Sequence, residues 1–164
     1  MGKSRSYEII EYRNKIINAI LDSPKLVKLL GYEDTDNIEE EIPWKCVYPH
    51  EFVPETITET KRFINFEIGA TIDSNNNVFK NITVYFYVMC HKDVIKYQEK
   101  GVNYLWYDKV VCELDNIFNN TEVIGIGKTM SFVDNFPYNP QQKFKGRLLR
   151  FTVKDFNNGL KYGK

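Results

Sequence analysis

The 164-residue sequence has no excess of either charge, with 22 Lys plus Arg residues and 22 Asp plus Glu residues. Proteins dedicated to nucleic-acid binding usually carry a basic excess, so this balance disfavours that class. No apolar run approaches the ~20 residues of a membrane-spanning helix, and the N-terminus lacks the apolar core of a signal peptide. We therefore expect a protein that has no membrane partner.

The sequence contains three cysteines, an odd number that does not make a disulfide framework. This indicates synthesis in a reducing, intracellular compartment. Cys46, His50, Cys90 and His91 are the residue types that bind zinc. However, Cys90 and His91 are adjacent on an expected strand, where neighbouring side chains point to opposite faces. We therefore expect no metal site, and we expect Cys90 to be a small core residue.

Signals for catalysis or cofactor binding are weak. Gly125-x-Gly127-Lys128-Thr129 resembles the end of a phosphate-binding loop, but Glu122 occupies the position of the first glycine. The residues after Lys128 also have the pattern of a strand, whereas a phosphate-binding loop opens a helix. A Cys–His nucleophile pair needs a close base and an orienting group, which no spacing here indicates. The sequence predicts a protein that is not an enzyme and has no cofactor.

Apolar residues make up 43% of the chain and aromatic residues 15%, which is typical of a globular protein. The length suits one domain. We interpret residues 1–164 as a single domain with N-terminal helices at 7–30 and an acidic and Pro-rich arm at 33–58. An α+β core follows at 60–156, and a C-terminal tail at 157–164.

Three segments have the three- and four-residue apolar spacing of helices. The first runs from Tyr7 to Leu21. The second runs from Pro24 to Leu30, with Ser23 as its N-cap and Gly31 as its C-terminal cap. The third runs from Tyr104 to Asn119. These helices each present one apolar side, which favours packing against a sheet.

Strand patterns occupy most of the remaining core. Apolar residues alternate from Arg62 to Ile72 and again from Val78 to His91, with an Asn-rich turn between them, which predicts a long antiparallel hairpin. Two more strands are expected at about 124–134 and 145–155, joined by a connection that contains residues 136–140. The predicted fold is α+β: an N-terminal helix, then an antiparallel sheet of two β-hairpins packed with helices, in the order helix–ββ–helix–ββ.

The charges are unevenly distributed. Residues 33–41 contain six acids and no base, and residues 143–164 contain seven bases and one acid. Between the acidic stretch and the hairpin, Pro43, Pro49 and Pro54 exclude a helix and disfavour a central strand. The same arm carries large apolar side chains. It is therefore either pinned across its own core or laid on a neighbouring molecule.

The order of elements resembles that of tail terminator and tail-completion proteins of tailed bacteriophages. Three stretches carry the resemblance to small neck proteins of this kind: YPHEFVPET (48–56), VMCHKD (88–93) and GRLLRFTVKDF (146–156). The resemblance implies a structural virion protein, made in the host bacterial cytoplasm. It implies a ring, usually a hexamer, at the head-proximal end of the tail that terminates the tube and joins it to the neck. The implied partners are further copies of the chain, the tail tube protein, possibly the sheath, and a head-side connector or adaptor.

A closed ring needs a contact between two different patches of the subunit. The acidic segment at 33–41 and the basic segment from Lys143 onward would be complementary in charge. The Pro-rich arm and the connection before Lys143 are further candidates for contacts with other subunits or with the tail. The predicted interface residues are Glu33, Asp34, Glu39, Glu40, Glu41, Trp44, Tyr48, Phe52, Phe136, Tyr138, Lys143, Lys145, Arg147 and Arg150.

Two alternatives remain open at this point. A head–tail connector subunit that does not terminate the tube would fit the same sequence. A nucleic-acid-binding module is an alternative of another class, because Tyr85, Tyr87 and Phe63 share one face of the hairpin and could stack on bases. The neutral charge argues against this module, and no sequence-specific nucleic acid is expected as a partner. A small-molecule enzyme has the least support.

Overall fold

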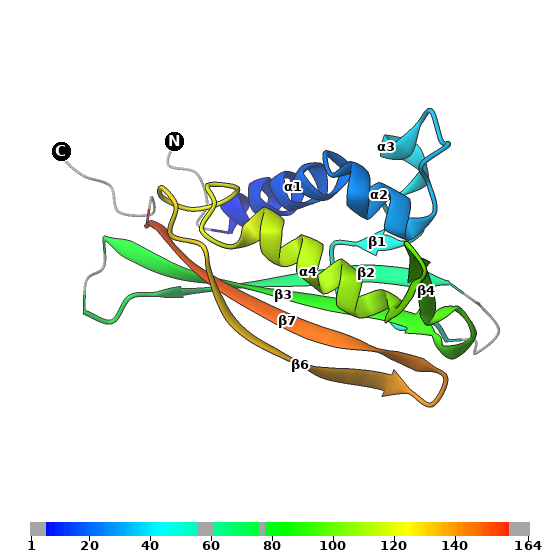
Figure 1. Ribbon diagram of the computed structural model, residues 1–164. Coiled ribbons are helices and arrows are strands. Elements are labelled where there is room, and N and C mark those ends of the chain that lie inside the picture. Colours follow the sequence, from blue (N-terminus) through cyan, green and yellow to red (C-terminus); the bar gives the residue numbers. More distant parts are fainter. Residues whose placement is uncertain (1–5, 56–60, 76–77, 158–164) are drawn as a thin grey trace.

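The computed structural model describes residues 6–55, 61–75 and 78–157. A five-stranded sheet has its helices on one face, and a separate two-stranded sheet lies at one end (Figure 1). The α+β class is therefore confirmed. The elements are α1 (Tyr7–Leu21), α2 (Pro24–Leu30), α3 (Ile38–Glu41), β1 (Val47–Tyr48), β2 (Arg62–Ile72), β3 (Phe79–His91), the 3₁₀ turn η1 (Lys92–Val94), β4 (Lys96–Glu99), β5 (Val102–Leu105), α4 (Trp106–Phe118), β6 (Ser131–Gln141) and β7 (Phe144–Phe156).

The two N-terminal helices have the bounds that the sequence predicted. The N–H of Leu26 donates to the Ser23 hydroxyl oxygen at 3.3 Å, which confirms the N-cap of α2. Gly31 ends α2 in the left-handed conformation, with φ +88°. The third predicted helix, α4, begins at Trp106 and not at Tyr104, because the residues before it form strand β5.

The long hairpin of β2 and β3 is confirmed. Ile64 pairs with Val88 and Phe66 with Phe86, and these side chains are buried on the helix-covered side. Of the Asn-rich turn, residues 76 and 77 lie outside the described part of the chain.

The expectation of a wholly antiparallel sheet was wrong. The strand order is β1-β2-β3-β7-β6, and β1 pairs parallel to β2. β1 contains two residues because it is followed by Pro49, which has no N–H to continue the pairing. The arm thus contributes an edge strand of its own sheet, and Ile42, Cys46 and Val47 are buried in the core.

Of the second pair of strands, β6 and β7, the bounds of β6 differ from the prediction. β6 starts at Ser131, and residues 136–140, which were predicted as a connection, lie inside it. The two prolines of this stretch misled the prediction. They are tolerated because β6 is the edge strand, where an N–H on the outer side has no partner to lose. Residues 119–130 precede the strand as a loop, with positive φ angles at Gly125 and Gly127.

Four residues of the acidic stretch form the short helix α3. Within the described residues, no helix has the length and apolar character that crossing a membrane requires.

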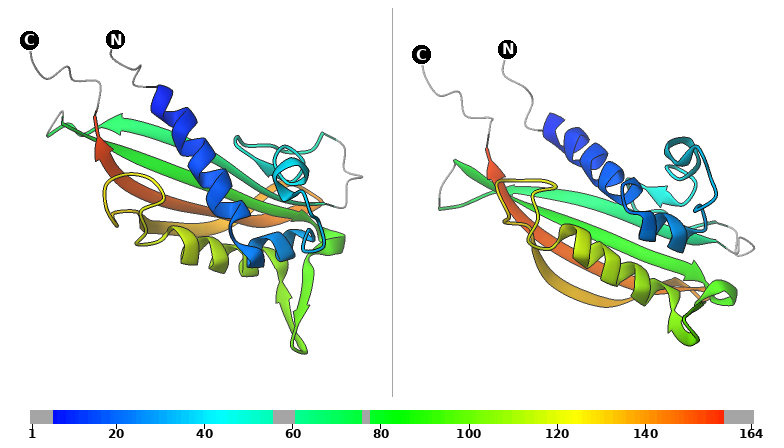
Figure 2. Two further views of the ribbon diagram at one scale, coloured as in Figure 1. Left: turned by 90° about the horizontal axis from the view of Figure 1, so that it is seen from above. Right: turned by 45° about the horizontal axis from the view of Figure 1, so that its top comes forward.

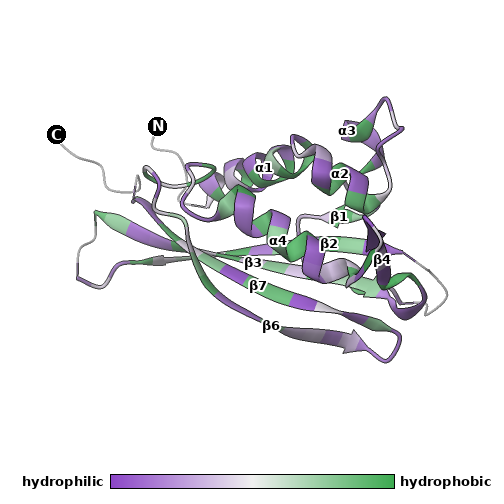
Figure 3. Cartoon of the chain, in the orientation of Figure 1, coloured by the Kyte–Doolittle hydropathy of each residue, from purple (hydrophilic) through white to green (hydrophobic). Residues whose placement is uncertain are grey.

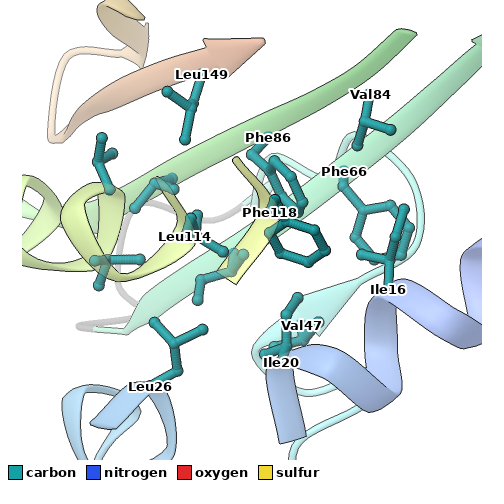
Figure 4. Packing of buried hydrophobic residues seen from close by; sticks show 14 of the residues in the cluster. Ile16, Ile20, Leu26, Val47, Phe66, Val84, Phe86, Leu114, Phe118 and Leu149 are labelled. Carbon is teal, nitrogen blue, oxygen red and sulfur yellow. The ribbon is translucent and has the colours of Figure 1, made fainter. Parts of the chain in front are cut away.

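The core lies between the sheet and helices α1, α2 and α4 (Figure 4). The rings of Phe86 and Phe118 lie 4.9 Å apart at its centre. Hydropathy alternates along the strands, as a sheet with two different faces requires (Figure 3). At the N-terminal end of α1, the buried Lys80 pairs with Glu8, and the Tyr12 hydroxyl donates to Asp155.

Candidate functional site

The face of the five-stranded sheet opposite the helices is the most prominent candidate surface, and we call it the open face. In Figure 1 the helices lie above the sheet and none lies below it. Directly paired residues of antiparallel strands point to the same face. The register therefore places on the open face Phe63, Asn65 and Glu67 of β2, Tyr85, Tyr87 and Met89 of β3, Phe144, Leu148 and Arg150 of β7, and Asp134, Phe136 and Tyr138 of β6.

The Pro-rich arm covers one end of this face. The Tyr48 and Phe52 rings stack with centroids 4.1 Å apart, and the Phe52 ring lies 5.6 Å from that of Phe63. The amide of Asn65 donates to the Phe52 carbonyl oxygen at 2.6 Å. Gln141 donates to the Pro54 carbonyl oxygen at 2.8 Å, which joins the arm to the end of β6. These contacts form a second, smaller core of buried Phe63, Met89 and Phe144, with Tyr48, Phe52 and Tyr138 packed against it.

Beyond the arm, the open face carries aromatic and apolar side chains that no described residue covers fully. Phe136 is 59% exposed, and Tyr85, Tyr87, Tyr138 and Leu148 are half-buried. The Tyr87 and Tyr138 rings lie 5.1 Å apart. Burial raises the pKa of both phenols, and the nearby Glu51 carboxylate raises it further. Both side chains are therefore neutral, and they suit a partner that covers aromatic surface.

The charged groups of the open face are mostly paired. Arg150 forms an ion pair with Asp134, and Glu67 is paired with Arg13 of α1. Glu51 accepts a hydrogen bond from the Tyr138 hydroxyl at 2.5 Å. The face therefore offers a phosphate backbone little free positive charge. Phe63, which was considered as a base-stacking residue, is completely buried under the arm and cannot stack on a ligand.

The acidic candidates form an exposed group around α3. Glu33, Asp34, Glu39 and Glu40 are exposed, and no ion pair of theirs occurs within the described residues. Glu41 is half-buried and pairs with Lys45 at 2.6 Å.

Trp44 follows this group and is 61% exposed. Its φ is +64°, a left-handed conformation that an L-residue adopts at a cost of about 1–2 kcal/mol. The hydrogen bond from its N–H to the Val47 carbonyl oxygen, at 2.9 Å, holds this conformation.

The basic candidates do not form one patch. Lys145 and Arg147 lie on the helix side of β7, and Arg150 lies on the open face. Arg147 pairs with Asp108 of α4 at 3.1 Å, and Arg150 with Asp134. Alternation along the strand thus separates charges that are close in sequence, and two of them are already neutralised within the chain.

Sequence reasoning missed the hairpin of β4 and β5. Its two-residue turn is Lys100-Gly101, with φ +50° and +79°, as a type I′ turn requires. Val102, Tyr104 and Leu105 are exposed on it. The available signal was the Lys-Gly pair between Tyr97 and Tyr104, which is weaker than the Asn-Gly or Asp-Gly pairs that mark such turns.

The residues considered for metal or nucleophilic chemistry do not come together. The Sγ of Cys46 lies 3.6 Å from the Ile42 carbonyl oxygen, and the His50 ring contacts the Glu51 carbonyl oxygen. Cys90 is buried in the core, as predicted, and His91 caps η1 by accepting from the Asp93 N–H at 3.3 Å. Burial raises the pKa of Cys46 to about 11 and that of Cys90 to about 12. Among the residues that the structure describes, no group of three or more potential ligands could hold a metal ion.

A sequence model of the YomW family matches residues 23–153, which include every element from α2 to β6 and most of β7. The chain belongs to the YomW family. YomW is a phage-derived protein family of Bacillus, of the SPβ prophage type, so the chain is a phage-associated protein. The resemblance to phage proteins is thereby confirmed at this level. No curated protein matches the chain.

Proposed function

We propose that this YomW-family protein is a structural virion subunit of a tailed phage or phage-like particle. In this proposal it forms a ring, with six copies expected, at the head-proximal end of the tail. The ring terminates the tail tube and joins it to the neck. Its partners are other copies of the chain, the tail tube protein, possibly the sheath, and a head-side connector.

The observation that carries the proposal is the open face with its exposed Phe136. Monomeric proteins rarely leave a continuous aromatic surface uncovered, and such surfaces usually mark contacts with other proteins. Tyr, Phe and Trp are also enriched in protein interfaces. The phage origin of the family supports an assembly role for this surface.

A structural role also agrees with the chemistry of the described residues. The thiols of Cys46 and Cys90 have raised pKa values, which makes them poor nucleophiles at neutral pH. His50 and His91 each contact neighbouring backbone groups. We therefore propose a role in assembly and not in catalysis.

Binding to purified tail tubes tests this function. The protein and the tubes are mixed, sedimented, and imaged by negative-stain electron microscopy. We expect the protein to sediment with the tubes, to form rings at one tube end, and to stop further addition of tube protein. The matched sample replaces the tubes with portal–adaptor complexes. Binding to those complexes alone would favour the connector alternative, and binding to neither would contradict a role in the tail or neck.

A filter-binding assay with DNA at low salt tests the alternative of another class. We expect no retention, because Arg150 is paired with Asp134 and the acidic Glu51 and Glu67 lie beside Tyr87. Retention that falls steeply with salt would support phosphate contacts and the nucleic-acid-binding alternative.

A further inference from the structure

The hairpin of β4 and β5 projects from one flank of the molecule. The left view of Figure 2 shows it extending away from the sheet and the helices. An isolated two-stranded hairpin is at best marginally stable in water. Here its base is fixed, because the backbone N–H of Trp106 donates to the Ile95 carbonyl oxygen. Glu99, next to the turn, also pairs with Lys109 of α4 at 2.8 Å. The hairpin is therefore held in position while Val102 and Leu105 remain exposed to a partner.

The hairpin combines apolar residues with unpaired positive charge. Val102 is 50% exposed and Leu105 43% exposed. Lys96 and Lys100 are exposed, and neither forms an ion pair with any described residue. A surface of this kind suits a partner that is acidic and also has an apolar groove.

Such a surface exists on the opposite flank of the same chain. In Figure 2, α3 and the arm lie across the helical layer from the hairpin in both views. There, five exposed acids have no ion pair among the described residues: Glu33, Asp34, Asp36, Glu39 and Glu40. Beside them, Ile10, Ile17, Trp44 and Pro49 contribute to a shallow groove of about 320 Å³. We call the acids and this groove the acidic flank.

We propose that the β4–β5 hairpin of one copy docks on the acidic flank of the next copy. Lys96 and Lys100 then face the acids around α3, and Leu105, which is paired with Lys96 and shares its face of the hairpin, covers the exposed Ile10 and Trp44. The strained backbone of Trp44 is consistent with a position kept for such a contact, because strain of this kind persists at functional sites. The inference rests on the proposed function, and it names the contact between the subunits.

Complementary patches on opposite flanks make a heterologous contact, in which every copy uses both patches. Such contacts close into a ring or continue as a filament. A second copy is therefore the occupant that the placement of the two patches favours. The basic partner of the acidic segment then becomes the hairpin, in place of the residues from Lys143 onward, where Arg147 and Arg150 are already paired.

Charge reversal with rescue tests the contact. Two double variants are made, K96E/K100E on the hairpin and E39K/E40K on the acidic flank, together with their combination. Assembly is followed by light scattering over a concentration series in 50 mM salt, with the same series repeated on tail tubes as template. We expect each double variant to raise the concentration for half-assembly about tenfold or more, because like charges then meet. The combination should recover most of the loss, and 0.5 M salt should reduce all of these differences.

The matched control is Lys128→Glu, which reverses an exposed lysine of the loop before β6. In Figure 1 this loop lies at the end of the sheet away from α3 and β4. The residues substituted in the two double variants and in the control are exposed, so circular dichroism should show that these variants are folded. A second readout uses a Cys112→Ser background with K100C and E40C and a bis-maleimide. Cross-links between copies, which depend on both new thiols, support the contact.

The outcomes separate the contact from the proposed function. If the wild type assembles and neither the hairpin variant nor the acidic-flank variant changes that assembly, the proposed contact is wrong and the ring proposal stands. Rescue of E39K/E40K by K143E/K145E instead of by the hairpin variant would also overturn it, in favour of the other basic segment. A wild type that assembles neither alone nor on tail tubes would reject the contact and the ring together.

Discussion

The hydroxyl of Tyr138 in β6 donates a hydrogen bond of 2.5 Å to the carboxylate of Glu51 in the arm, across 87 positions of sequence. This bond ties the arm to the far edge of the sheet over the open face. We expect Tyr138→Phe to loosen the arm and to lower the free energy of unfolding by about 1 kcal/mol. The loss is small because water can hydrogen-bond to the partly exposed Glu51 carboxylate in place of the hydroxyl. Hydrogen exchange at the arm amides, including the Glu51 N–H, should become faster while exchange in β3 stays unchanged.

The matched variant is Glu51→Gln, which keeps an oxygen that can accept from Tyr138. Its arm should exchange nearly as slowly as in the wild type. Equal exchange in Tyr138→Phe and the wild type would mean that the stacked Tyr48 and Phe52, and not this bond, hold the arm.

Gly125 is a position where no other residue fits. Its φ is +83°, and an added Cβ would lie 2.3 Å from the Cγ2 of Val153 and 2.6 Å from the Lys154 carbonyl oxygen. Gly125→Ala should therefore destabilise the protein by about 2–4 kcal/mol, from backbone strain together with a clash against β7. Gly127 also has a positive φ but has no atom within 4 Å of an added Cβ, so Gly127→Ala should cost about 1–2 kcal/mol. Urea unfolding measures both values, and equal losses would contradict the role assigned to the clash.

Thiol labelling should distinguish the three cysteines. Cys112 is exposed, and Cys46 and Cys90 are buried with raised pKa values. At pH 8 we expect one thiol to react rapidly and the other two only after unfolding. The Cys112→Ser variant should lose the rapid phase completely. Rapid reaction of a second thiol in folded protein would contradict the burial of that residue.

The same two thiols predict a loss of stability in alkali. Their folded pKa values, about 11 and about 12, exceed the ordinary value of 9.0 that applies to the unfolded chain. Below pH 9 both states are protonated and nothing is lost. Above pH 9 the unfolded state ionises first, so the free energy of unfolding should fall as the pH rises towards 12. Urea unfolding between pH 7 and pH 10.5 tests this, and Cys46→Ala with Cys90→Ala should reduce the slope above pH 9. An equal slope in this variant would assign the loss to tyrosines such as Tyr12, whose pKa burial also raises.

The sequence predicted correctly those elements whose formation depends on interactions between neighbouring residues. The cap at Ser23, the left-handed Gly31 and the alternation through β2 and β3 each follow from a few neighbouring residues. The class of the fold followed from the order of these elements. The parallel pairing of β1 did not, because it depends on how the chain returns to the sheet after α3.

The candidate surfaces were harder to predict for the same reason. Prolines at 137 and 140 indicated a connection, and only the position of β6 at the sheet edge explains why they are tolerated there. The residues from Lys143 onward looked like one basic patch in sequence, but strand alternation divides them between two faces. The exposed aromatic Phe136 and the arm residues Tyr48 and Phe52 were predicted as candidates, whereas the covering of Phe63 by the arm needed the tertiary structure.

Phe136 offers the sharpest test of the open face as an assembly surface. It is 59% exposed, so Phe136→Ser should change the free energy of unfolding by less than about 0.5 kcal/mol. Removing an aromatic anchor from an interface commonly costs 2 kcal/mol or more, so binding to tail tubes should weaken at least about thirtyfold. Ile72→Ser is the matched control, because Ile72 is 45% exposed and its alternation places it on the other face of the sheet. Weakened binding in Phe136→Ser alone would identify the open face as the contact surface, whereas equal binding in both variants would exclude Phe136 from it.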